Sequence, residues 1–82
     1  MRVLGYRKSD FTAEDGTAIK GFNVFIGSDI DPERGEGLAT ERVYMSDNKL
    51  ERNGIDLVEL LEKDVKVYFN KFGKVDTIVL DD

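Results

Sequence analysis

The chain has 82 residues, of which 40% are hydrophobic and 35% charged, and its formal net charge is −5. This composition is typical of a single small folded domain over residues 1–82 and excludes a disordered chain. His and Cys are both absent, which excludes disulfides, thiolate zinc sites and the commonest general base. We therefore expect no enzymatic activity, no metal site and no cofactor.

Targeting and membrane signals are the next features to consider. The N-terminal residues lack the apolar stretch of a signal peptide, and no segment of the chain approaches the length of a membrane span. We therefore expect a cytoplasmic protein that does not contact a membrane.

The first half of the chain predicts three strands. An extended run begins at Val3 and ends near Phe11, and a following Asp-Gly pair can supply the positive φ of a tight hairpin turn. A second strand is expected over 19–26. A polar loop over 27–37 contains the only proline, and a third strand is expected over 38–45.

The second half predicts one short helix and two further strands. Asp56 is a suitable N-cap, with Glu59 three residues later, and the helix is expected to end at Asp64. Strands are expected over 65–69 and over 74–80, joined by a turn that contains Asn and Gly.

This order of elements predicts a mainly β fold. A five-stranded OB-like Greek-key barrel, β-β-β-α-β-β, has one short helix between its third and fourth strands. An SH3-like barrel is the main alternative, but it does not ordinarily carry a capped helix at that position. The OB-like barrel is therefore our prediction.

Basic and aromatic residues share one alternating set on each of four predicted strands. Successive side chains of a strand point to opposite faces, so residues two apart share a face. Most acidic residues fall in turns, near the helix or at the end of the chain, while the complementary sets (Val65, Val67 and Phe69; Val43 and Met45) are assigned to the barrel interior. The predicted face contains Arg2, Leu4, Tyr6 and Lys8; Lys20, Phe22 and Val24; Thr40, Arg42, Tyr44 and Ser46; and Lys66, Tyr68 and Asn70.

A basic surface with aromatic side chains suits a single nucleic-acid strand, because bases stack on the rings while Lys and Arg follow the phosphates. We therefore predict a non-catalytic, sequence-tolerant protein that binds single-stranded DNA as a homodimer, with RNA as an alternative ligand. The predicted binding residues are Lys20, Phe22, Arg42, Tyr44, Lys66 and Tyr68, with Lys8, Lys71, Phe72 and Lys74 at the rim.

Two other interpretations of this surface remain open. The same residue types are common on the solvated face of a sheet, and a register slip of one residue would remove a strand from the predicted face. The acidic total charge also favours a protein-interaction or assembly module, in which the same aromatic face would form an oligomer interface.

Two segments carry a family resemblance. Asp10-Phe11-Thr12, then Asp15-Gly16 and Lys20-Gly21 before an apolar strand, resemble the start of the filamentous-phage gene V type helix-destabilising proteins. The hairpin over 67–74 resembles a late hairpin there, and more closely that of small prophage- and plasmid-encoded relatives in Gram-positive bacteria. The resemblance implies a homodimeric OB-type protein that coats single-stranded DNA cooperatively during replication. The chain departs from the family at Glu14, where a basic residue would be expected, and in its more acidic composition.

Overall fold

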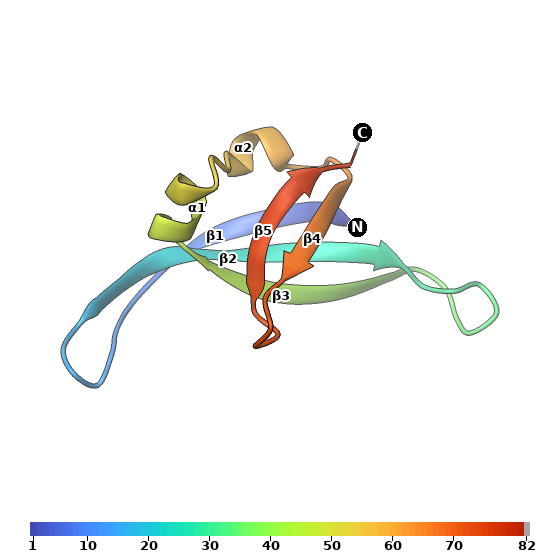
Figure 1. Ribbon diagram of the computed structural model, residues 1–82. Helices are drawn as coiled ribbons and strands as arrows, with labels where there is room; N and C mark the ends of the chain where they lie inside the picture. Colours follow the sequence, from blue (N-terminus) through green and yellow to red (C-terminus); the bar gives the residue numbers. More distant parts are fainter. Residues whose placement is uncertain (82) are drawn as a thin grey trace.

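A computed structural model describes residues 1–81 of the chain. The fold is mainly β, with five strands in two antiparallel sheets (Figure 1). The three-stranded sheet has the order β1-β2-β3, and a β-hairpin of β4 and β5 forms the second sheet. The elements are β1 (Arg2–Thr12), β2 (Ala18–Asp29), β3 (Leu38–Ser46), α1 (Asp47–Arg52), α2 (Leu57–Leu60), β4 (Val65–Phe69) and β5 (Val75–Leu80).

Local turn chemistry explains why both predicted hairpins form. In the β1–β2 turn, Gly16 takes a φ of 86° and the Thr17 backbone N–H donates to Asp15 Oδ1 at 2.9 Å. In the β4–β5 turn, Gly73 takes a φ of 78°, and Asn70 Oδ1 accepts hydrogen bonds from two backbone N–H groups of the same turn. In each turn a short polar side chain caps the backbone and Gly adopts the left-handed conformation.

The segment between β3 and β4 contains two short helices where the sequence predicted one. Asp56 caps α2 as predicted, because its carboxylate accepts from the Val58 backbone N–H at 3.0 Å, but α2 ends at Leu60. The additional helix, α1, begins after Ser46, whose Oγ accepts from the Lys49 backbone N–H at 3.2 Å. α1 buries only one residue, so it leaves no periodic apolar pattern in the sequence.

The hydrophobic core lies on one face of the three-stranded sheet, where the two helices and the β4–β5 hairpin cover it (Figure 1). We call this the inner face. Of the predicted interior residues, Met45 and Val65 are buried and Val43 and Val67 pack against the core, whereas Phe69 is 49% exposed at the end of β4. The buried core residues are Val3, Val24, Ile26, Met45, Leu50, Leu57, Leu60, Val65, Val75 and Ile78.

Within residues 1–81 the five strands do not close into the predicted barrel. β1 reaches the start of β4 through an isolated antiparallel bridge between Arg2 and Asp64, and the Val65 N–H donates to the Met1 carbonyl at 2.7 Å. β3 and β5 lie near each other but belong to different sheets. β4 and β5 have only five and six residues, so they cannot follow the much longer strands of the other sheet. The mainly β class is confirmed, and closure of the barrel is not.

Candidate nucleic-acid interface

The register of the three-stranded sheet decides which side chains share a face. Residues paired directly across antiparallel strands point to the same face. Tyr6 pairs with Val24 and Lys8 with Phe22, so these residues lie on the inner face. On the other side, which we call the open face, Phe25 pairs with Arg42, and Asn23 pairs with both Arg7 and Tyr44. Arg2 pairs with Gly27 and so points to the same side as Phe25. The basic and aromatic residues of the open face are Arg2, Arg7, Phe11, Phe25, Arg42 and Tyr44.

The prediction that the basic and aromatic sets form one continuous face is therefore wrong. Lys20 and Phe22 lie on the inner face of β2, whereas Arg42 and Tyr44 lie on the open face of β3. The error has a single cause: Phe22 pairs with Met45 and not with Tyr44, so the two predicted sets are offset by one residue. Lys8 lies on the inner face as well.

The open face combines three arginines with three aromatic rings. The Arg7 guanidinium carbon lies 5.8 Å from the centroid of the Phe25 ring, within the range of a cation–π contact. The Phe11 and Tyr44 rings meet edge to face, with centroids 5.8 Å apart, and Phe11 is 50% exposed. Among the paired residues of β1–β3, the one carboxylate on this face is Asp29, at the far end of β2.

Gly21 makes room for the Tyr44 ring on the open face. A Cβ atom at Gly21 would lie 2.5 Å from the Tyr44 hydroxyl oxygen and 2.5 Å from the Met45 carbonyl oxygen. The Tyr44 hydroxyl is buried and has no hydrogen-bond partner in the described part of the chain. Loss of hydration raises the pKa of Tyr44, and the carboxylates of Asp47 and Asp10 raise it further. Tyr44 is therefore held in one orientation by packing.

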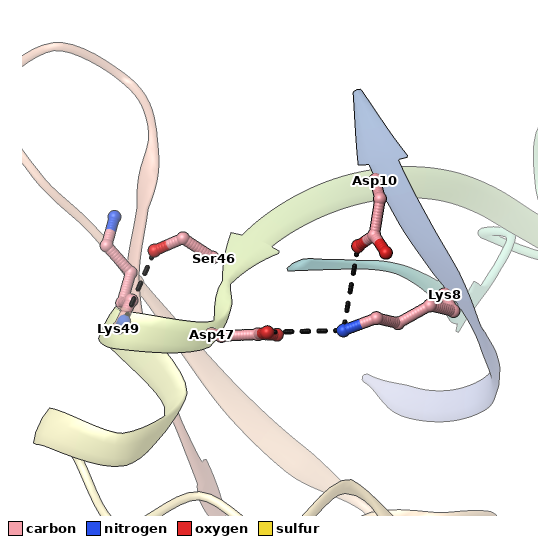
Figure 2. Close-up of polar contacts among 5 residues, drawn as sticks. All are labelled: Lys8, Asp10, Ser46, Asp47 and Lys49. Carbon is pink, nitrogen blue, oxygen red and sulfur yellow. Dashed lines mark hydrogen bonds and ion pairs between the residues drawn. The ribbon is translucent and has the colours of Figure 1, made fainter. Parts of the chain in front are cut away.

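Lys8 is held by two carboxylates (Figure 2). Its Nζ lies 3.1 Å from Asp47 Oδ2, at the start of α1, and 3.6 Å from Asp10 Oδ1. The hydrogen bond to Asp47 is the main reason that the pKa of Lys8 is raised. The same Nζ lies 4.8 Å from the centroid of Phe22, whose ring packs against Tyr6 and the core. Lys8 and Phe22 thus have partners within the chain.

Four of the five predicted residues of the β4–β5 hairpin, all except Lys74, lie apart from the open face. Lys66 and Tyr68 are exposed on the side of β4 opposite to the buried Val65, and Lys66 Nζ lies 3.7 Å from Asp81 Oδ1. Phe72 is at the turn and is 73% exposed, with Lys71 Nζ 5.2 Å from the centroid of its ring.

A groove of about 380 Å³ separates β3 from the end of the β4–β5 hairpin. It brings Arg42 and Tyr44 of the open face together with Lys74, and Lys49 and Phe69 complete its charged and aromatic lining. Lys49 Nζ donates to the Val75 carbonyl at 2.7 Å, which places this cation at the groove. The groove lining contains three cations and no carboxylate, so it suits an anionic group beside a ring.

Sequence reasoning missed several residues of this surface. Arg7, Phe11 and Phe25 lie in strands that were predicted correctly, and only the pairing register could have assigned them to the face of Arg42. Phe69 was assigned to the interior. Lys49 lies in a helix that the sequence did not predict, so no sequence signal pointed to it.

No family model, curated protein or solved structure matches this chain. Over residues 1–81, neither helix has the length or the apolar character that crossing a bilayer requires. In the same residues, Asp and Glu side chains form no group of three or more that could hold a metal ion.

Proposed function

We propose that this chain binds single-stranded nucleic acid, in the first place DNA, without strong sequence preference and without catalysis. The observation that carries the proposal is the open face, where Arg7 and Arg42 flank the Phe25 ring and the one strand carboxylate among the paired residues, Asp29, lies at the far end of β2. Bases of any nucleic-acid sequence can stack on aromatic rings, and each stacked base contributes roughly 1–3 kcal/mol to the free energy of binding. Guanidinium groups bind phosphate oxygens.

The groove beside β3 would extend this surface. Arg42 and Tyr44 belong to both the open face and the groove, so a strand crossing the sheet would pass from Phe25 toward Lys74 and Phe69. The net charge of −5 does not oppose this path, because binding to phosphates depends on the local distribution of charge.

We also propose that the fold is an open variant of the OB arrangement. Two observations support this assignment: the start of β4 meets the start of β1, and β5 lies beside β3. With the sheet order β1-β2-β3, these neighbours would give the strand order of an OB barrel whose seam is incompletely paired. A gene V type relationship remains a prediction from the sequence.

A fluorescence titration with oligo-dT at ~50 mM salt tests the proposed function. We expect saturable binding that weakens as salt is added, and an Arg42→Ala variant should bind more weakly than the wild type. Lys20→Ala is the matched control, because Lys20 is also an exposed strand cation but lies on the inner face. If Lys20→Ala weakens binding more than Arg42→Ala does, the ligand does not bind at the open face. If the wild type does not bind oligo-dT, the proposed function is wrong.

A protein-interaction module is the second candidate, supported by the exposed aromatic residues Tyr68, Phe69 and Phe72 and by the acidic total charge. In that case Tyr44→Ala combined with Tyr68→Ala should change the mass measured by sedimentation. Under the nucleic-acid proposal the same pair should weaken oligo-dT binding and leave the mass unchanged.

A further inference from the structure

A second aromatic surface lies away from the open face, between the inner face of the sheet and the helices. It is a groove of about 330 Å³ whose apolar lining includes Tyr6, Phe22, Leu57 and Val58. Val58 is 68% exposed at the rim, and Asp56 adds a carboxylate there. The volume is at the low end of the pockets that hold small ligands, roughly 300–1,000 Å³, and is sufficient for one aromatic side chain. We call this the helix groove.

The most exposed large apolar side chain of the described residues is Phe72, at 73%. It projects from the β4–β5 turn, between Lys71 and Lys74, and the five turn residues 70–74 contain no acidic residue. An exposed aromatic ring flanked by two cations has the form of an anchor for a pocket with an acidic rim.

The helix groove has the complementary charge. Asp56 is the carboxylate that lines the groove, and the segment over 47–64, to which its helical wall belongs, contains six acidic and three basic residues, a formal charge of −3 against +2 for the turn. On the opposite wall, Lys8 beside the Phe22 ring is paired with Asp10 and Asp47. α2 lies at the end of the β4–β5 hairpin opposite the turn (Figure 1), and Phe72 does not line the helix groove of its own chain. We therefore assign the Phe72 ring to the groove of another copy.

From this complementarity we propose that a second copy of this chain occupies the helix groove, with Phe72 of one copy inserted between Val58 and Phe22 of the next. Such a contact joins two different surfaces, so it is heterologous and leaves a free turn and a free groove at the two ends. Copies therefore add one after another into an open row. This association does not depend on the proposed binding of nucleic acid and is tested without it.

Two blocking variants test the contact directly. Phe72→Ser removes the anchor, and Val58→Glu places a charge in the groove; both positions are exposed, and a carboxylate in the first turn of α2 suits the helix dipole. Each variant alone should sediment as a monomer, because every contact would lack one partner. An equimolar mixture retains one intact turn and one intact groove per pair, so it should form dimers and nothing larger.

The wild type should instead show a mass that keeps rising with concentration up to ~0.1 mM protein and beyond, as expected for a weak contact. Val79→Ser, which removes another exposed apolar side chain, is the control and should behave as the wild type does. The proposal is overturned if the mixture remains monomeric, if the wild type stops at a dimer, or if each blocking variant still forms dimers by itself.

A charge swap adds a second, independent measurement. Lys71→Glu and Glu59→Lys should each weaken association by about three- to fivefold, as expected for rim charges, whereas the double variant should recover most of the wild-type association. Additive losses in the double variant would show that the turn does not contact α2 of the neighbouring copy, and would overturn this orientation.

Discussion

Two adjacent residues of β1 illustrate how different the two faces of the sheet are. Arg7 and Lys8 each lie over a phenylalanine ring, at 5.8 and 4.8 Å from its centroid. Lys8 lies on the inner face, where Asp10 and Asp47 pair with it and Phe22 packs against the core. Arg7 lies on the open face, next to the Phe25 ring, on the side of the sheet away from α1 and α2 (Figure 1).

The comparison teaches that a cation beside an aromatic ring is not by itself a binding surface. What differs is the surroundings of the pair. On the inner face, the ion pair between Lys8 and Asp47 links β1 to α1 (Figure 2). The Phe22 ring packs against the core and so contributes to folding. On the open face neither group has such a role, so both remain available to a ligand.

The largest expected difference between the faces is in stability. Ile26→Ala on the inner face should lower the free energy of unfolding by about 3 kcal/mol, because Ile26 is fully buried and its truncation leaves a cavity in the core. Its neighbour on the open face, Phe25→Ala, should cost about 1 kcal/mol, since solvent fills the space. Urea unfolding of both variants measures the contrast, and equal losses would mean that the open face is also covered.

A glycine substitution should have the next largest effect. Gly21→Ala forces either the Tyr44 ring or the Met45 carbonyl to move, so we expect a loss of about 2 kcal/mol in the free energy of unfolding. Gly27→Ala is the control, because its Cβ would meet only the flexible Leu4 side chain, at 2.8 Å. If Gly21→Ala is no more costly than Gly27→Ala in the same urea experiment, the packing of Tyr44 is not as rigid as described.

The two cation–aromatic pairs should differ in binding by a smaller factor. Arg7→Ala should weaken oligo-dT binding roughly fivefold and reduce the slope of log K against log salt by about 1, because one phosphate contact is lost. Lys8→Ala should leave affinity and slope unchanged, since Asp47 and Asp10 already neutralise this cation. A larger loss with Lys8→Ala would place the ligand on the inner face.

The smallest expected effect concerns the β1–β2 turn, which lies beyond both faces. The hydrogen bond from the Thr17 backbone N–H lowers the pKa of Asp15 below its ordinary value of 3.8. This carboxylate therefore contributes stability that is complete above about pH 4 to 5 and is lost as the pH falls through the lower folded-state value. Asp15→Asn keeps an acceptor but cannot titrate, so thermal unfolding should show a shallower acid dependence for this variant; an unchanged profile would contradict the assignment.

Much of the fold could be predicted from local features of the sequence. The five strands, both hairpin turns and the Asp56 cap depend on residues within a few positions of one another, and β4 has the predicted bounds. The six-residue α1 was missed, because its signal is a Ser46 cap and one buried residue. Closure of the barrel was predicted from the order of elements alone, and that order does not determine whether β3 and β5 pair.

The candidate surface could be predicted only in part. Arg42 and Tyr44 share one face of β3, as alternation along the strand predicted, and Lys74 lies with them at the groove. Lys20 and Phe22 were assigned to that face from alternation within β2, which gives two faces but does not say which of them meets which face of β3.

The sequence alone determined the alternation of each strand, the positions of the turns and the placement of most carboxylates outside the strands, because these features follow from local backbone preferences. Only the tertiary structure decided the register between strands and, with it, which face the helices cover. Register results from burying Val24, Ile26 and Met45 together, residues that are distant along the chain, so it follows from packing and not from any single segment.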